Sequence, residues 1–435
     1  MSNAEAGSIT LLLLVLLCAA HLFGHVFARL RQPRVIGEIF AGLLLGPSVL
    51  GHFAPALSTA LLPTAKSGAH GTVLNFVYWM GLLLLMFVSG NETRRLFAKS
   101  DRKQTIWLAT FGTVLPFVLF LLVAPLMPIE AMLGTAGNRT ALILVIGIAV
   151  AVTSIPVISR IFYDLKILHT RFASLVLGVA VVEDIALWGV LGVATALASS
   201  AALAPSAMAS HVVATIVYFG IGLTLAPLLL RRLHTARWNL LAAASPAGYA
   251  MGILFAYTAL AAVFDISLVF AAFLAGFAVR TENERFADAL ESISKFAFAV
   301  FIPIYFAVVG YRLDLSKSFS VGLLAAFIGL ACAIKLVSVW TGAKLAGFGN
   351  LDSVNLAVAF NARGGPGIVL ASVAYDAQII NAAMYTAMVL LAVVTSQAAG
   401  AWLELVIRRG WPLLSGDAVQ SQTAEGDAAQ EKLAA

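Results

Sequence analysis

The sequence has little charge and almost no cysteine. Only 11% of its 435 residues are Asp, Glu, Lys or Arg, 61% are hydrophobic, and the mean hydropathy is +0.96. Water-soluble domains carry about 25% charged residues, so this composition excludes a soluble fold and indicates a membrane protein. The two cysteines, Cys18 and Cys332, lie in separate apolar segments, which argues against a disulfide framework and makes both of them packing residues.

Several functional signatures are also missing. The sequence has no strand-linked G-x-G-x-x-G motif, so a nucleotide-sensing module is not expected. His21 and His25 are one helical turn apart without a third candidate ligand, so we interpret them as polar packing residues. Two adjacent acids, Glu183 and Asp184, lie within an apolar run, but no catalytic nucleophile and no set of metal ligands accompanies them. The sequence therefore predicts neither an enzyme nor a bound cofactor.

Long apolar runs fill most of the chain. Runs of about 18 or more residues recur from Ile9 to Val406, and each could cross a hydrocarbon layer ~30 Å thick as a helix. They are too long and too uniformly apolar for the strands of a β-barrel. The sequence therefore predicts an all-α polytopic membrane protein embedded in a lipid membrane through residues 1–412, with a short disordered tail over 413–435. About thirteen transmembrane helices are expected, near residues 8–28, 35–52, 72–90, 105–127, 140–162, 172–198, 209–230, 239–263, 265–280, 293–310, 319–343, 353–375 and 380–407.

The basic residues set the expected orientation. The net charge is +6, but most of the 27 Lys and Arg residues fall in alternate loops and at the C-terminus, which does not fit a nucleic-acid surface. The positive-inside rule then places the N-terminus outside and the C-terminus in the cytoplasm of a cell (inner) membrane, as an odd number of spans requires. The opposite loops hold only Lys66, Arg139, Arg312 and Lys317.

Four acidic residues lie within the expected spans. A charged side chain near the bilayer centre costs a few kcal/mol, so each one needs a structural or functional reason. Glu38 and Glu404 lie near span ends, where they can reach interfacial water or nearby arginines, and we give them no role. Glu183 and Asp184, in "VVEDIALW" (181–188), lie roughly 18 Å from either end of their span and must face protein or a water-filled cavity.

The two adjacent acids cannot serve one ligand symmetrically. Neighbouring helical residues point about 100° apart, so one carboxylate should face a cavity while the other meets a partner. The candidate partner is Lys335, which is buried in an apolar span and is as costly there as a lone acid. A purely structural bridge is the alternative, but one acid would suffice for that.

Two spans carry signals of an interrupted helix. Pro156, in "GIAVAVTSIPVISRIF" (147–162), would leave the carbonyl of Val152 without its helical partner beside the hydroxyls of Thr153 and Ser154. In "AVAFNARGGPGIVLASV" (357–373), Pro366 would do the same to the carbonyl of Ala362. Paired breaks at membrane depth are typical of transporter sites built from inverted repeats. The second break also contains a mid-span arginine that needs a carboxylate or the negative end of a half-helix, and its expected residues are Asn361, Arg363, Gly364, Gly365 and Pro366.

Taken together, six ordered motifs resemble the monovalent cation:proton antiporter-2 family, with its sodium/proton antiporters and Kef-like membrane domains. The match runs from about residue 8 to residue 408. The motifs are "RQPRVIGEIFAGLLLGPSVLG" (31–51), "GLLLLMFVSGNE" (81–92), "VTSIPVISRIF" (152–162), "VVEDIALW" (181–188), "FIPIYFAVVGYRLDL" (301–315) and "NARGGPGIVLASV" (361–373).

The resemblance implies an inverted-repeat sodium/proton antiporter fold with two discontinuous helices that cross near the carboxylates, usually in a homodimer. It implies core helices over approximately 105–198 and 319–407, and dimer or scaffold helices over approximately 8–90 and 209–310. It further implies that Asp184 is the carboxylate that binds cation and proton, that Glu183 holds the variable preceding position, and that Lys335 is the basic residue of the core. Thr153 and Ser154 match the polar pair of the first break. Glutamate at position 183 and "SGNETR" in the second motif depart from the commoner family pattern.

The chemistry can be stated without the family. A small cation needs oxygen ligands, and carboxylate, hydroxyl and carbonyl groups supply them. If Asp184 must lose its proton to bind sodium or potassium, the two ions compete, and competition coupled to alternating access is sufficient for exchange. The sequence therefore predicts a secondary active transporter, with sodium favoured, potassium/proton exchange as the alternative, and a channel, an enzyme or a sensor as weaker rivals.

Overall fold

The computed structural model describes residues 2–415, apart from residues 31, 57, 59–68, 97–101, 169, 200–204, 237–238, 280–283, 314 and 316–320. The described part is helical, with one isolated bridge between Leu133 and Ile380. Lys66, Lys317 and residues 416–435 of the expected tail lie outside the described residues.

The expected spans all have helices. Within the described ranges, ten helices are long and apolar enough to cross a membrane, and the bent pair Ala209–Leu223 and Leu225–His234 could form an eleventh span. Two shorter apolar helices, Arg139–Ala151 and Leu268–Ala278, occupy the remaining two predicted spans. The all-α fold class is therefore confirmed, and each of the thirteen predicted spans contains a helix. Helices are expected here because every backbone amide and carbonyl must be satisfied within the segment when no water is present.

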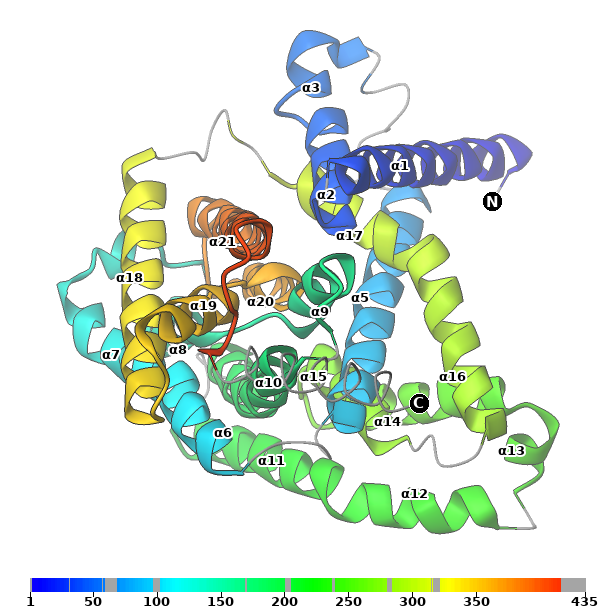
Figure 1. Ribbon diagram of the computed structural model, residues 1–435. Coiled ribbons are helices and arrows are strands. Elements are labelled where there is room, and N and C mark those ends of the chain that lie inside the picture. The colour runs from blue at the N-terminus through cyan, green and yellow to red at the C-terminus, as the bar shows by residue number, and fades with distance from the viewer. Residues whose placement is uncertain are drawn as a thin grey trace, which may run out of the picture.

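The helices gather into two groups that lie side by side (Figure 1). We call the first the α5 group. It contains α1 (Asn3–Arg29), α2 (Arg34–Leu45), α3 (Leu50–Phe53), α5 (Ala69–Leu96), α13 (Leu240–Ala244), α14 (Pro246–Val263), α15 (Leu268–Ala278), α16 (Glu284–Phe296), the π-helix η4 (Ala297–Phe301) and α17 (Ile302–Tyr311).

The second group, which we call the α20 group, carries both interrupted helices. It contains α6 (Arg102–Ala109), the π-helix η1 (Thr110–Val114), α7 (Leu115–Val123), the 3-10 turns η2 (Ala124–Leu126) and η3 (Ile129–Ala131), α8 (Arg139–Ala151), α9 (Ile155–Asp164), α10 (Arg171–Ser199), α18 (Val321–Leu345), α19 (Asn350–Phe360), α20 (Gly364–Asp376) and α21 (Ala382–Arg408). Helices α11 (Pro205–Leu223) and α12 (Leu225–Thr235) run along one edge from this group to the first (Figure 1).

Reciprocal glycine contacts hold the α5 group tightly together. A Cβ on Gly276 of α15 would lie 1.8 Å from the carbonyl oxygen of Phe87, and one on Gly90 of α5 would lie 2.0 Å from that of Phe273. Small residues at membrane helix interfaces allow this close approach, which increases dispersion contact between backbones. The α5 and α15 helices therefore pack with their backbones in direct contact.

Loop contacts join the two repeats of the α20 group. The amides of Gly134 and Ala136 donate to the carbonyls of Ile379 and Gln378, and the amide of Asn381 donates to the carbonyl of Met132. These bonds tie the loop before α8 to the loop before α21. Both interrupted spans are thereby fixed to a common end of the group.

Residues 413–415 are more ordered than the sequence suggested. Leu414 is buried, and the amide and hydroxyl of Ser415 donate to the carboxylate of Asp352 at 3.0 and 2.9 Å. Residues 413–415 were expected in the disordered tail but pack against the start of α19, because Asp352 offers an acceptor that the sequence pattern did not indicate.

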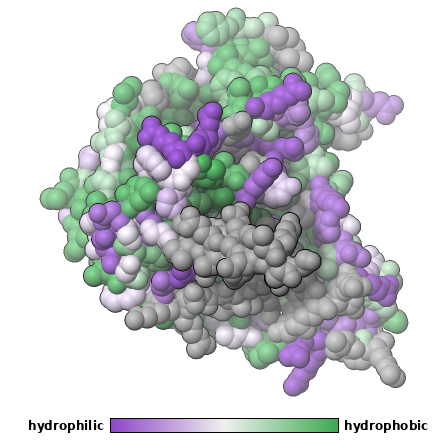
Figure 2. Space-filling view, in the orientation of Figure 1, coloured by the Kyte–Doolittle hydropathy of each residue, from purple (hydrophilic) through white to green (hydrophobic). Residues whose placement is uncertain are grey.

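Figure 2 shows a hydrophobic hollow on the face turned to the viewer, with hydrophilic side chains along its upper border.

Candidate functional site

The two interrupted helices meet at their breaks. Helix α8 ends at Ala151 and α9 begins at Ile155, while α19 ends at Phe360 and α20 begins at Gly364. Across the crossing, the amide of Ser154 donates to the carbonyl of Ala362 at 2.7 Å, and the hydroxyl of Thr153 donates to the carbonyl of Phe360 at 2.7 Å. The backbone carbonyls of Phe360 and Ala362 at the second break thus accept hydrogen bonds from the side chain of Thr153 and the amide of Ser154 at the first break.

Gly364 allows this close approach. Its φ is +36°, and a Cβ there would lie 2.3 Å from Cγ2 of Val157 and 2.8 Å from Oγ of Ser154. Ser154 in turn caps α9, because its hydroxyl accepts from the amide of Val157 at 3.3 Å. Pro156 lies in the first turn of α9 and Pro366 in that of α20, where a missing amide hydrogen costs no helical bond.

Arg363 binds the end of the opposite half-helix. Its guanidinium donates to the carbonyls of Ala149 at 2.7 Å and Val150 at 3.0 Å, in the last turn of α8, and to the carbonyl of Ala331 at 2.9 Å. It also donates to the side-chain oxygen of Asn361 at 2.6 Å. The last carbonyls of a helix lack helical partners and carry partial negative charge. The sequence predicted that Arg363 would contact either a carboxylate or the negative end of a half-helix. The structure shows the contact with the half-helix end, that of α8.

Lys335 pairs with Glu183. Its ammonium lies 3.0 Å from Oε1 of Glu183, donates to the carbonyl of Gly112 at 2.7 Å and also donates to the carbonyl of Ala151. Both charged side chains are fully buried. An ammonium has three hydrogens to donate, so Lys335 is saturated by these three acceptors.

Asp184 differs from its neighbour. Its side chain is fully buried, and neither carboxylate oxygen has a hydrogen-bond partner among the described residues. The second oxygen of Glu183 and the hydroxyl of Thr113 are also unpartnered within the described part of the chain. Glu183 thus meets the partner that helix geometry predicted for one acid of the pair, whereas Asp184, predicted to face a cavity, is not among the residues that line the cavity described below.

Gly112 and Thr113 are site residues that the sequence reasoning missed. They lie in η1, a π-helical turn that ends two residues before Pro116, and a Cβ on Gly112 would lie 3.1 Å from Oε1 of Glu183. Such π-bulges are common at functional sites. Pro116 was the available signal, since a proline withholds the amide that would bond the carbonyl four residues earlier.

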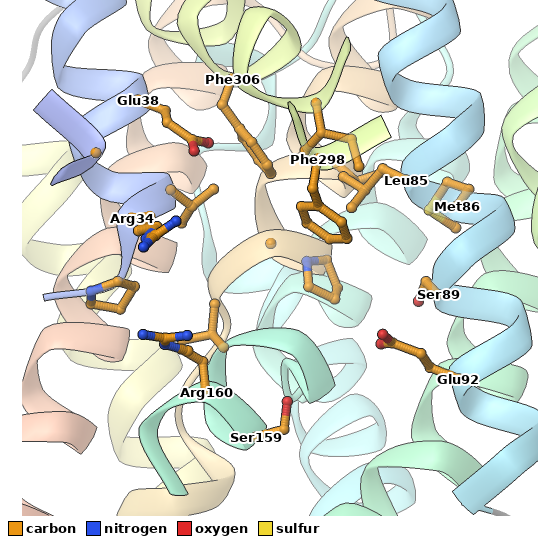
Figure 3. Close-up of a pocket in the computed structure, with 18 of the residues that line it drawn as sticks. Arg34, Glu38, Leu85, Met86, Ser89, Glu92, Ser159, Arg160, Phe298 and Phe306 are labelled. Carbon is orange, nitrogen blue, oxygen red and sulfur yellow. The ribbon is translucent and has the colours of Figure 1, made fainter. Parts of the chain in front are cut away.

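A cavity of about 780 Å³ separates the two helix groups at one end. Arg34 and Glu38 line it from α2, Ser89 and Glu92 from α5, and Arg160 from α9 (Figure 3). Gly365 and Pro366 of the second break also line it, as does Trp188, one helical turn after Asp184. The cavity therefore reaches the crossing and comes within one turn of Asp184 along α10.

The remaining polar residues have ordinary surroundings. Glu404 lies 4.0 Å from Arg408, one turn away, as expected for a pair near a span end. His21 Nε2 donates to the carbonyl of Ala299 at 2.8 Å. Among the described residues, no group of three or more His, Cys, Asp or Glu side chains could hold a metal ion.

Comparison with known proteins gives a consistent set of similarities. A family model described as "Sodium/hydrogen exchanger, transmembrane" matches residues 12–409. The chain is 29% identical to K(+)/H(+) antiporter 1 of Saccharomyces cerevisiae, over 88% of this chain and 44% of that protein. It is 28% identical to Na(+)/H(+) antiporter NhaS4 of Synechocystis, over 88% of this chain and 93% of that protein.

The relatives differ in length. The chain spans about half the length of the first curated relatives it matches, such as Cation/H(+) antiporter 18 of Arabidopsis thaliana, at 26% identity and 47% coverage of that protein. Among solved structures, the sodium proton antiporter MjNhaP1 of Methanocaldococcus jannaschii superimposes with a TM-score of 0.61 over 92% of this chain and 98% of that one. At 16% identity this similarity concerns the fold alone.

Proposed function

Because the chain belongs to the sodium/hydrogen exchanger family, whose model spans residues 12–409, we propose that it is a membrane antiporter that exchanges a monovalent cation for protons. The expectation of a monovalent cation:proton antiporter family and of a multi-pass helical membrane protein is confirmed. The activity, the ion and the residue roles below are our proposal.

One observation carries the proposal: Asp184 is fully buried and its carboxylate has no donor or basic partner among the described residues. An isolated ionised carboxylate in an apolar interior is very costly, so the group must be neutralised. A proton does this by binding an oxygen, and a monovalent cation does it by coordination. The two cannot occupy the same carboxylate together, and their competition couples the two gradients.

The other charges at the crossing are already compensated. Lys335 balances Glu183, and Arg363 takes the carbonyls at the end of α8. The exchangeable charge is thereby confined to Asp184. In this mechanism the hydroxyls of Thr153 and Ser154 and freed backbone carbonyls complete the oxygen ligands of the cation, since alkali-metal ions are bound by such oxygens.

Transport then follows from movement of the α20 group against the α5 group. The cavity gives the cation access from the end that carries Arg34 and Arg160. We propose that this end faces the cytoplasm, and the positive-inside distribution of basic residues supports this orientation. The cation displaces the proton, the neutralised site moves between the two access states, and a proton returns it. We propose that the α5 group is the scaffold that forms a homodimer, with the N-terminus outside the cell membrane.

Sodium is the proposed cation. Two curated relatives that this chain matches over more than nine tenths of their length are named Na(+)/H(+) antiporter NhaS4 and Na(+)/H(+)-K(+) antiporter GerN, the latter from Bacillus cereus at 24% identity. Potassium is the second candidate, because a K(+)/H(+) antiporter has the higher identity of 29%.

The test is cation-driven proton movement in proteoliposomes, read with a pH-sensitive dye for sodium and potassium separately. We expect Asp184→Asn to abolish exchange, because the amide can neither release a proton nor neutralise a cation. Glu404→Gln is the matched control, since it removes an acid near the end of another span, and it should exchange as the wild type does. Exchange that persists in a folded Asp184→Asn protein would remove Asp184 from the mechanism.

A further inference from the structure

A three-residue contact closes the interface between the helix groups at the end opposite the cavity. The hydroxyl of Tyr78 donates to Oδ2 of Asp376 at 2.8 Å, and Nη1 of Arg312 donates to Oδ1 of the same carboxylate at 2.8 Å. The guanidinium carbon of Arg312 lies 4.1 Å from the centre of the Tyr78 ring. Each of the three side chains therefore contacts the other two, and both carboxylate oxygens are used.

The three residues come from both groups. Tyr78 lies on α5 and Arg312 directly follows α17, whereas Asp376 is the last residue of α20. Their ion pair is partly exposed, with side-chain accessibilities of 26% for Arg312 and 23% for Asp376. The contact is therefore made at the mouth of the interface rather than in its interior.

A layer of tyrosines lies beneath this contact. The hydroxyl of Tyr305 donates to Oγ of Ser372, one turn before Asp376, at 3.2 Å. The hydroxyl of Tyr385 on α21 donates to the carbonyl of Val309 on α17 at 3.1 Å, and the rings of Tyr78 and Tyr305 are 5.2 Å apart. Tyr78, Tyr305, Tyr385 and Ser372 are all buried, so this end of the interface is sealed from solvent.

The same three helices line the cavity at their other ends. Helix α5 contributes Ser89 (Figure 3), α17 contributes its first residue, Ile302, and α20 contributes Pro366. One interface is therefore open at one end and closed at the other. A second access state would require the reverse, and the contacts that must break are those of Tyr78, Arg312 and Asp376.

We infer that Tyr78, Arg312 and Asp376 form a latch that sets the equilibrium between the two access states, by favouring the state in which the cavity is open. The inference rests on the proposed function, because an antiporter that works by alternating access needs both states. It also accounts for a basic residue in a loop where the charge distribution predicts few: Arg312 is held by a carboxylate and a tyrosine ring. A contact made in one state alone shifts the population by its whole differential free energy.

Thiol accessibility tests the latch without requiring transport. With Cys18 and Cys332 replaced by serine, we place one reporter in the cavity, Ser89→Cys, and a second beneath the latch, Ser372→Cys. A membrane-impermeant maleimide is applied to right-side-out and to inside-out vesicles. With the latch intact, Ser89→Cys should react from one side and Ser372→Cys should be protected from both.

Breaking the latch should reverse this pattern. We expect Asp376→Asn, and independently Arg312→Gln, to raise labelling of Ser372→Cys from the opposite side by about tenfold or more, as loss of a charge-assisted pair implies, and to lower labelling of Ser89→Cys. Asp376→Glu keeps the acid and should restore much of the protection. Glu130→Gln is the matched control, because the Glu130 to Arg139 ion pair lies wholly within the α20 group. It should change neither reporter.

Unchanged labelling of both reporters in folded Asp376→Asn and Arg312→Gln proteins would overturn the latch. That failure is separable from failure of the proposed function. If Asp184→Asn abolishes exchange while the latch variants label as the parent does, the transporter stands without the latch. If the latch variants shift labelling while Asp184→Asn still exchanges, the conformational equilibrium stands without Asp184.

Discussion

Removing the charge of Lys335 should destabilise the protein strongly, and removing Glu183 with it should recover much of the loss. Lys335 donates to Glu183 Oε1 at 3.0 Å, to Gly112 at 2.7 Å and to Ala151, and both side chains of the pair are fully buried. Removal of one partner of a buried ion pair costs about 3–5 kcal/mol, because the other charge is left uncompensated. Lys335→Met should therefore lower the free energy of unfolding by about this amount, and Glu183→Gln by a comparable amount.

The double variant Glu183→Gln/Lys335→Met separates the pair from its surroundings. It removes both charges at nearly constant volume, and neutral replacement of a buried pair is often close to neutral in stability. We expect its loss to be smaller than the sum of the single losses by about 3 kcal/mol or more, as a double-mutant cycle measures. The assay is denaturant unfolding in detergent followed by tryptophan fluorescence.

Two comparisons make the result decisive. Lys295 and Glu291 form an ion pair 2.7 Å apart with both side chains more than half exposed, so Lys295→Met should leave stability unchanged within error. Additive losses in the Glu183 and Lys335 cycle would show that the buried pair is not the source of the destabilisation.

In proteoliposomes, Lys335→Met should also alter the pH profile or the voltage dependence of exchange, and an unaltered profile would leave Lys335 with a structural role alone.

Two further predictions test the scaffold and the ion site. Gly276→Ala places a Cβ 1.8 Å from the carbonyl of Phe87, so α5 and α15 must separate, and we expect a loss of about 1–3 kcal/mol in the same unfolding assay. A Cβ on Gly220 would have nothing within 4 Å, so Gly220→Ala should not destabilise the protein. If Gly276→Ala were as stable as Gly220→Ala, the close packing of α5 against α15 would be refuted. Competition at one carboxylate predicts that the half-saturating cation concentration rises about tenfold for each unit fall in pH on the acidic limb. Initial rates of dye response across pH measure this, and a half-saturating concentration that is independent of pH would rule out a shared site.

The helical architecture can be predicted from the sequence because the thickness of the hydrocarbon layer sets a minimum length for each membrane-spanning helix. Runs of apolar residues therefore locate the spans, and every predicted span contains a helix. Proline and glycine locate the two breaks for a similarly local reason, since a missing amide hydrogen and a positive φ are properties of single residues. What the sequence could not supply is which breaks and charges meet, because Ser154 and Ala362, or Lys335 and Glu183, are brought together only by packing.

The latch shows the limit of local reasoning most clearly. Arg312 and Asp376 lie at the ends of helices, where a charged residue can reach the membrane interface, and Tyr78 lies within the first half of α5. None of them is costly enough alone to require a partner. Glu183 and Lys335 were identified because mid-span charges demand compensation, whereas a contact among interfacial residues leaves no such signature in the sequence.

Proline gives a sharper rule than the sequence reasoning applied. In an α-helix a proline cannot bond the carbonyl four residues before it, and three such carbonyls here accept from distant donors. The amide of Ser154 donates to the carbonyl of Ala362, four residues before Pro366. Lys335 donates to the carbonyl of Gly112, four residues before Pro116. His21 donates to the carbonyl of Ala299, four residues before Pro303. Two of these sites lie in π-helical turns, η1 and η4, that end two residues before the proline. In a solvent without hydrogen-bond donors a freed carbonyl must find one within the protein, and the donors that meet the carbonyls of Ala362, Gly112 and Ala299 tie separate helices together.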